Sequence, residues 1–190
     1  MSREVRGEEE EMVARVLDGV PLVSQKKSNS CWAACSAMLL SWKNKRFVGE
    51  AEAVKMAGPD WVAKYEANVR LASHEIERFA RDFRLRTEGP STIFPVGYED
   101  LLEKRGPIWV GTAINNVGRY SYAHARVLYG ILGDDSGQNT TMYLLDPSPE
   151  GTGAGSYKQS FKKFMEELEA WAKEDQKNGN QNFAPQVFHF

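Results

Sequence analysis

The chain has 190 residues, of which 42% are hydrophobic and 26% are charged, and its formal net charge is -2. This composition is ordinary for a globular protein, and the length suits one domain or two small lobes that share a cleft. The densest basic clusters, Lys26-Lys27 and Lys43 to Arg46, are too short to form a nucleic-acid footprint. We therefore expect no nucleic-acid partner.

The sequence also bears on localisation. No apolar run approaches the ~18 residues that a membrane span requires, and the acidic stretch Glu8 to Glu11 is unlike a secretory signal. We expect no membrane partner and synthesis in the cytoplasm, with any secretion or delivery into a target cell using a route without a cleavable signal peptide.

The first half of the chain is predicted to be helical. Residues 1–19 are charge-rich with a weak helical stripe from Val5 to Leu17, which indicates an appendage or linker before a body over residues 20–190. From Cys31, apolar or small side chains recur with helical spacing, and Asn29 or Ser30 can cap the start of this helix. Further helices are expected at 50–57, 61–69, 74–84 and 98–105.

The period of the pattern changes after Gly106-Pro107. Strands are expected at 108–114, 123–132, 140–145 and 184–190, with one helix at about 160–173. Helices first and strands later indicate an α+β protein, with a helical part over about 31–105 and a β part over about 107–190.

The two cysteines are too few for a disulfide framework and read as catalytic, metal-binding or buried thiols. A thiol attacks as its thiolate, and a helix N-terminus favours that form through its unpaired N–H groups and dipole. Cys31 lies where the first long helix begins, whereas Cys35 lies one turn deeper among apolar neighbours. We interpret Cys31 as the candidate nucleophile and Cys35 as a small buried hydrophobe.

A catalytic thiol also needs a base, and the chain has three histidines. His74 falls in the first turn of a predicted helix, where the helix dipole opposes protonation, and His189 lies at a strand end that can fray. His124 opens a strand rich in core residues, so it can be held in a fixed position. We therefore interpret His124 as the candidate base.

The strands at 123–132 and 140–145 flank Gly133 to Gly137, a strong turn signal that predicts an antiparallel hairpin. The midpoint of residues 124 and 146 is residue 135, at the centre of this turn. His124 and Asp146 are therefore expected opposite one another, within about one residue if a bulge intervenes. Directly opposed Cβ atoms lie ~4.5–5.5 Å apart, so Asp146 is the candidate that orients His124.

The segment around Cys31 resembles a known family. Gln25, five intervening residues and Cys31 followed by Trp32 are similar to the papain-like Gln-x5-Cys signature. The run from Val20 to Cys35 is especially similar to papain-like effector proteases that pathogenic bacteria deliver into host cells. His124 on a strand and Leu145-Asp146-Pro147 also resemble these effectors and the peptidases that trim bacteriocin leaders. The resemblance covers about residues 20–150.

This resemblance implies a papain-like catalytic domain over 20–190, with the active site in the cleft between a helical lobe and an antiparallel β lobe. It implies a cysteine peptidase in which the Gln25 side chain and the Cys31 backbone N–H form the oxyanion hole. It implies a protein or peptide substrate, no cofactor and no metal, and an effector or toxin type with a cognate inhibitor or immunity protein. The chain departs from papain in having Trp32 directly after the nucleophile and Asp146 in place of an asparagine.

Candidate substrate-binding residues follow from their positions near the expected cleft. Trp32 follows the nucleophile, Asn116 belongs to a loop shortly before the candidate base, and Tyr122 lies near the start of the same strand. Tyr120 and Trp109 are further cleft candidates, although a buried strand position explains Trp109 at least as well.

The sequence supports other functions to different degrees. A thioredoxin-like site needs two residues between its cysteines, and three separate Cys31 from Cys35. A structural zinc site lacks a second ligand pair. An acyltransferase or deamidase that uses the same triad stays open, as does a binding module that has lost activity.

Overall fold

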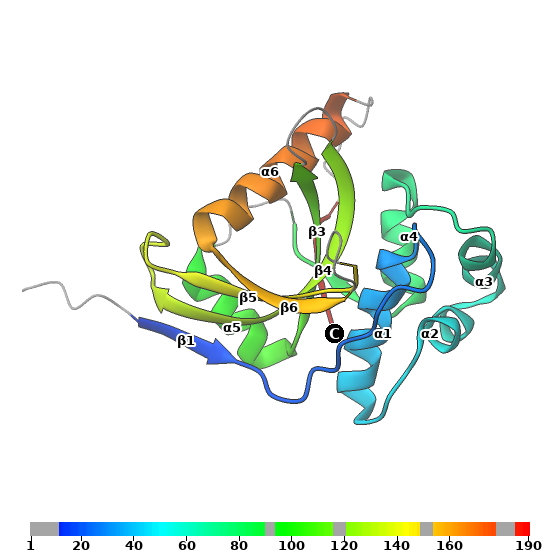
Figure 1. The fold of residues 1–190 in the computed structure, drawn as a ribbon, viewed down its shortest axis with the longest axis horizontal. Helices are drawn as coiled ribbons and strands as arrows, with labels where there is room; N and C mark the ends of the chain where they lie inside the picture. The colour runs from blue at the N-terminus through cyan, green and yellow to red at the C-terminus, as the bar shows by residue number, and fades with distance from the viewer. Residues whose placement is uncertain (1–11, 90–93, 116–120, 149–153, 178–184) are drawn as a thin grey trace, which may run out of the picture.

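The computed structural model describes residues 12–89, 94–115, 121–148, 154–177 and 185–190. It has helices packed against one antiparallel sheet, with α1 to α4 on one side of the molecule and the sheet with α5 and α6 on the other (Figure 1). The predicted α+β class is therefore confirmed.

The helical lobe is built around its first helix. The elements are α1 (Cys31–Asn44), α2 (Glu50–Ala57), α3 (Pro59–Glu66), the 3₁₀ turn η1 (Ser73–Glu75) and α4 (Ile76–Asp82). Residues 32–41 of α1 are all buried, which is typical of a helix enclosed on every side rather than amphipathic. The helix ends at Lys45 in the left-handed conformation, and Gly58 with Pro59 starts α3.

Within the part of the chain that the structure describes, the sheet contains seven strands. They are β1 (Met12–Val16), β2 (Arg86–Thr87), β3 (Ile108–Asn115), β4 (Ser121–Asp134), β5 (Thr141–Asp146), β6 (Gly155–Ser160) and β7 (Val187–His189). Their order is β2-β7-β3-β4-β5-β6, and β1 pairs with β4 beside this path. Every pairing is antiparallel.

Two helices lie among the strands in the chain order and pack against the sheet. They are α5 (Pro95–Arg105) and α6 (Phe161–Lys177). Both helices were expected, at 98–105 and about 160–173, and the observed helices are slightly longer. No helix within the described ranges is long and apolar enough to cross a membrane.

The first strand corrects one expectation. The apolar spacing before residue 18 suggested a helix, but Met12–Val16 forms a strand that pairs with β4. Val13 is fully buried in the core between the sheet, α5 and α6, whereas Met12 is 63% exposed. The alternation of buried and exposed side chains therefore follows the period of a strand.

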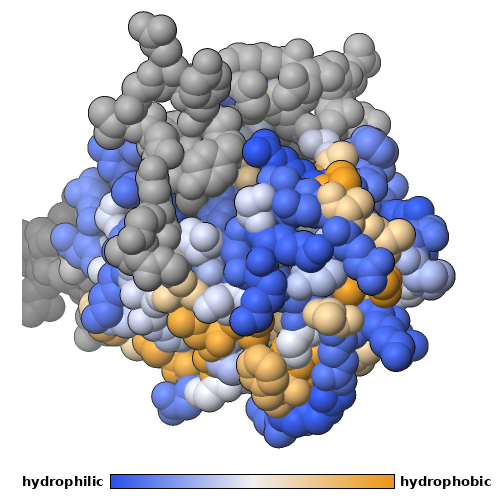
Figure 2. All heavy atoms as spheres, turned by 45° about the vertical axis from the view of Figure 1, so that its right-hand side comes forward, coloured by the Kyte–Doolittle hydropathy of each residue, from blue (hydrophilic) through white to orange (hydrophobic). Residues whose placement is uncertain are grey.

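The described residues form two hydrophobic core clusters. The larger one joins α1 to one face of the sheet through residues such as Trp32, Trp109 and Val127. The smaller one lies on the other face, under α5 and α6, and contains Leu128 and Phe164. Among the coloured residues in Figure 2, hydrophilic ones predominate, and hydrophobic ones gather at the lower edge and on the right.

The β4–β5 hairpin forms as predicted, but its register is shifted. Val127 pairs with Leu145 and Leu128 with Leu144, and an irregularity follows between Leu128 and Gly130. Continuing this register places Asp146 opposite Arg126, two residues from His124, so the direct opposition predicted for His124 and Asp146 is wrong.

The connection between the two strands explains this shift. The Asp134 carboxylate accepts hydrogen bonds from Ser136 and Asn139, and the Thr140 hydroxyl donates to the Asp134 carbonyl oxygen. These bonds join Asp134 to residues 136–140, so the turn is centred after residue 135. The centre of the hairpin therefore lies closer to the C-terminus than the sequence predicted.

Candidate active site

Cys31 is the first residue of α1 and is half-buried. The hydroxyl of Ser30, the N-cap residue, makes no capping bond to the helix and instead donates to Glu50 Oε1 at 2.6 Å. The first N–H groups of a helix have no intrahelical acceptor. Cys31 therefore lies at the N-terminus of α1, where the helix dipole favours a negative charge, as the sequence predicted.

Glu50 fixes this helix start from α2. It is 3% exposed and accepts hydrogen bonds from the Lys26 backbone N–H, the Ser30 hydroxyl and the Tyr65 hydroxyl. Three donors satisfy the carboxylate oxygens, so burial of this side chain is compensated. Glu50 escaped the sequence analysis because nothing local marks a helical glutamate as buried.

His124 and Asp146 are in direct contact. The Nε2 atom of His124 donates to Asp146 Oδ1 across 2.7 Å, and both side chains are 7% exposed. The offset of two residues keeps them on the same face of the sheet because side chains alternate along a strand. Asp146 Oδ1 also accepts the Ser148 backbone N–H at 2.8 Å, which fixes the carboxylate.

The His124 ring also forms a hydrogen bond with Cys31. Since Nε2 is taken by Asp146, the nitrogen that faces the thiol is Nδ1. Burial lowers the pKa of His124, but the hydrogen bonds to Asp146 and Cys31 and their charges outweigh burial and raise it to about 9. The site thus favours a protonated imidazole at His124, between the Cys31 side chain and Asp146.

Gln25 lies next to this group. Its backbone N–H donates to the Pro147 carbonyl oxygen at 3.2 Å, which ties it to the residue after Asp146. Its side-chain Nε2 donates to the carbonyl oxygens of Lys27 and Ser28, and its Oε1 is buried with no donor among the residues that the structure describes. The oxyanion role of Gln25 stays a prediction, because its amide N–H groups are directed at these two carbonyls.

The other cysteine and histidines lie outside this group. Cys35 is fully buried, and burial raises the pKa of its thiol well above the usual value, with Cys31 adding to the effect. His74 is exposed in η1, whereas His189 is buried and donates to Glu88 at 2.7 Å. No three His, Cys, Asp or Glu side chains of the described residues gather as metal ligands.

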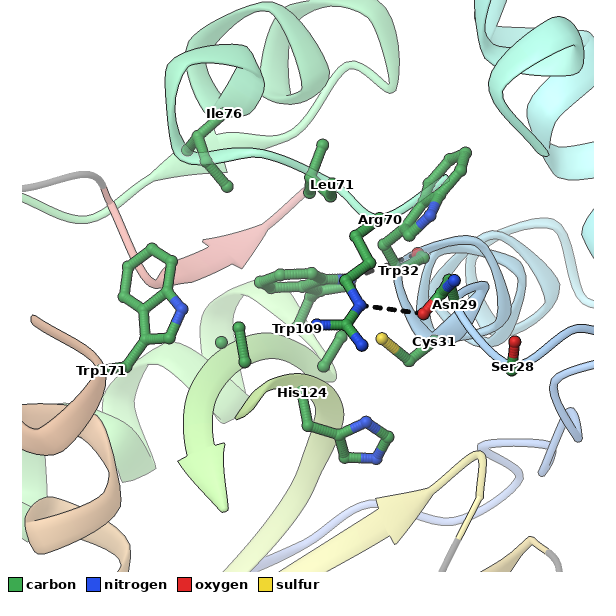
Figure 3. A pocket seen from close by; sticks show the side chains of 13 residues that line it. Ser28, Asn29, Cys31, Trp32, Arg70, Leu71, Ile76, Trp109, His124 and Trp171 are labelled. Atoms are coloured by element: carbon green, nitrogen blue, oxygen red, sulfur yellow. Dashed lines mark hydrogen bonds between the residues drawn. The ribbon is translucent and has the colours of Figure 1, made fainter. Parts of the chain in front are cut away.

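A pocket opens between the two lobes at Cys31 and His124 (Figure 3). Its walls are mostly apolar and include three indole rings, those of Trp32, Trp109 and Trp171. Its lining residues are Ser28, Asn29, Cys31, Trp32, Arg70, Leu71, Ile76, Trp109, Gly111, Ala123, His124, Ala125 and Trp171.

The structure describes the three predicted substrate-binding residues to different extents. Trp32 lines the pocket, but it is 1% exposed and its ring packs against Trp61 and Phe79, so most of it belongs to the core. Asn116 lies outside the described residues. Tyr122 is placed in β4 opposite Ile114, and its side chain lies outside the description.

Sequence analysis missed several pocket residues, and two of them, Arg70 and Trp171, carry large side chains. Arg70 comes from the segment between α3 and η1, and Trp171 comes from α6. Both are distant from Cys31 in the sequence and reach it only through tertiary packing. The tryptophan carried a weak signal, since it falls within the predicted helix at 160–173 that packs on the sheet.

Comparison with known proteins identifies the family of the chain. A family model described as papain-like cysteine protease AvrRpt2 matches residues 15–169, which include Cys31, His124 and Asp146. The chain belongs to this papain-like cysteine protease family. It is therefore a cysteine peptidase, and the resemblance seen in the sequence is confirmed.

A solved structure shares the fold of the peptidase. It is described as a C39-like peptidase from Bacillus anthracis and matches with a TM-score of 0.56 and 14% identity. The match covers 93% of this chain and 97% of the other. A search of curated proteins gave no match.

Proposed function

We propose that the peptidase hydrolyses peptide bonds with Cys31 as nucleophile, His124 as acid and base, and Asp146 as the residue that orients His124. The observation that carries this proposal is the position of His124, which contacts Cys31 through one side of its ring and Asp146 through the other. Together with a pocket at the Cys31 side chain, this is the arrangement that nucleophilic catalysis requires.

The reaction proceeds in two steps. The Cys31 thiolate attacks the substrate carbonyl carbon, and protonated His124 gives its Nδ1 proton to the leaving amine, which leaves an acyl-enzyme thioester. Neutral His124 then takes a proton from water, the resulting hydroxide attacks the thioester, and the thiolate departs with the carboxylic acid released. Asp146 holds the Nε2 proton throughout and stabilises the imidazolium.

The oxyanion of each tetrahedral intermediate is proposed to bind at the start of α1. The backbone N–H of Cys31 supplies one donor, and the Gln25 amide supplies the second after turning away from the carbonyl oxygens of Lys27 and Ser28. Loss of one such donor typically lowers kcat by about 10²–10³. Gln25→Ala is therefore expected to reduce kcat by that factor.

The substrate is proposed to be a specific protein, as for an effector or toxin of bacterial type. The sequence similarity of the segment from Val20 to Cys35 to delivered effector proteases supports this proposal. A cognate inhibitor or immunity protein that covers the pocket would then protect the producing cell.

Incubation of a proteome with wild type and with Cys31→Ala tests the proposed reaction. New peptide termini that appear only with wild type, read by mass spectrometry, are the expected result. Amine adducts or deamidated glutamines without new termini would instead identify an acyltransferase or deamidase. A proteome unchanged by wild type would contradict peptidase action by this triad and favour a binding module.

A further inference from the structure

Arg70 places a positive charge at the pocket. It is exposed, and it lines the pocket together with Cys31, Trp109 and Trp171. Figure 3 shows its side chain reaching from the segment before η1 to a place between Trp109 and Cys31. Its guanidinium therefore lies within the pocket, near the thiol that a substrate must reach.

The guanidinium is held in this position by a hydrogen-bonded frame. Arg70 Nε donates to Asn29 Oδ1 at 2.9 Å. Asn29 is in turn fixed by Asn68. The backbone N–H of Asn29 donates to Asn68 Oδ1 at 3.0 Å, and its side-chain Nδ2 donates to the Asn68 carbonyl oxygen at 2.9 Å. Asn68 adopts a left-handed conformation with φ of 55° and donates to Ser28. Because this frame already restricts the side chain, less conformational entropy is lost when a ligand binds.

The terminal guanidinium nitrogens are available to a ligand. Within the described ranges, Arg70 forms no ion pair, although Arg46, Arg78 and Arg126 each pair with a carboxylate. Among the described residues that line the pocket, none is acidic. A guanidinium presents a planar fork that suits a carboxylate, and it disfavours a cation at the same place.

We propose that Arg70 determines specificity by binding a carboxylate of the peptide substrate next to the residue that fills the apolar pocket. The carboxylate comes from an Asp or Glu side chain or from the C-terminus of the peptide. This inference rests on the proposed function, since it assigns a substrate preference to the same site.

A matched peptide series tests the role of Arg70. A peptide found in the proteome digest is made with Glu, Gln or Lys at each position flanking the scissile bond, with both ends blocked, and again with a free C-terminus. For wild type, kcat/KM for Glu at one position should exceed that for Gln by about fivefold, and high salt should reduce this ratio. A preference seen only with the free C-terminus assigns the carboxylate to the end of the peptide.

Variants separate Arg70 from the general charge of the protein. Arg70→Gln should bring the Glu to Gln ratio to about one, and Arg70→Glu should reverse the preference in favour of Lys. Arg86→Gln, which removes an exposed arginine of β2, should keep the wild-type ratio. No preference in wild type, or a preference that persists in Arg70→Gln, would overturn the inference while leaving the proposed function intact.

If no peptide is cleaved, that result counts against the proposed function but not against the role of Arg70. A binding assay then tests the role of Arg70 by itself. Library peptides are passed over immobilised Cys31→Ala protein and over Cys31→Ala/Arg70→Gln protein. Enrichment of acidic or free-carboxylate peptides on the first protein and its loss on the second support the role of Arg70. Equal or absent enrichment on the two proteins would overturn it.

Discussion

The chemistry of the site depends on the surroundings of one residue, His124. Burial alone would lower its pKa and leave the ring neutral, but the contacts with Asp146 and Cys31 raise it to about 9. The ring is therefore protonated at neutral pH and ready to donate a proton to a leaving amine. The Asp146 contact makes this possible, since it both orients the ring and favours its charged form.

Asp146→Asn is expected to lower the pKa of His124 from about 9 toward the ordinary value of about 6.5. The amide can still hold the ring, but it no longer supplies a negative charge. A pH titration of the His124 ring signals by NMR measures the change, with His189, which pairs with Glu88, as the internal control. A midpoint for His124 that stays near 9 in the variant would show that Asp146 does not set its protonation.

At the scale of elements, helix α6 is joined to the strands that carry the site. Glu167 on α6 accepts hydrogen bonds from Arg126 of β4 at 2.6 Å and from Gln159 of β6 at 3.1 Å. Arg126 is 1% exposed and lies two residues after His124, and it also contacts Thr112. This buried network fixes α6, and with it the position of Trp171 one turn after Glu167 in the pocket wall.

Glu167→Ala should lower the free energy of unfolding by about 3–5 kcal/mol, because it leaves the buried Arg126 charge without its carboxylate. Denaturant unfolding measures this loss. Glu169→Ala is the matched control on the same helix, since Glu169 is 62% exposed and should change stability by less than about 0.5 kcal/mol. Equal effects of the two substitutions would mean that the Arg126 network contributes nothing measurable.

The elements differ in how well the sequence predicts them. The helix at 50–57 and the start of the helix at Cys31 have local signals, namely apolar spacing and turn residues. The structure confirms the predicted range 50–57 and the predicted helix start at Cys31. The short strand β2 and the polar strand β6 were missed, because their pairing partners are distant in the sequence and define them more than composition does.

The site residues also differ in how well the sequence predicts them. Cys31 and His124 were selected from their local contexts, whereas Asp146 was selected from the hairpin expected around residue 135. The structure places Asp146 two residues out of that register but on the same face, in contact with His124. The exact register could not be predicted, because Asp134 closes the turn and an irregularity follows Leu128. Pocket residues supplied by separate segments, such as Arg70, require the tertiary structure.

At the scale of the whole molecule, the two lobes are joined through α1, which packs against β4. The larger core cluster spans this contact, and the smaller one supports the opposite face of the same strand. β4 therefore carries His124 between two packed layers. The strand β1 pairs with the far end of β4 and contributes Val13 to the second cluster.

Val13→Ala should lower the free energy of unfolding by about 2 kcal/mol, since it removes two buried methyl groups and leaves a cavity. Met12→Ala, at the exposed neighbouring position of β1, should change stability by less than about 0.5 kcal/mol. Thermal or denaturant unfolding of both variants measures the difference. A Val13 variant as stable as wild type would contradict the placement of β1 in the sheet.

The central claim is that Cys31 is a nucleophile activated by His124, and the rate of thiol alkylation tests it most directly. Iodoacetamide is added near neutral pH to wild type and to His124→Ala, and peptide mass spectrometry follows Cys31 and Cys35 separately. In wild type, Cys31 should be labelled far faster than Cys35, whose burial raises its pKa and blocks access. His124→Ala should abolish most of this advantage. Equal, slow labelling of both cysteines in wild type, or fast labelling of Cys31 that is unaffected by loss of His124, would contradict the claim.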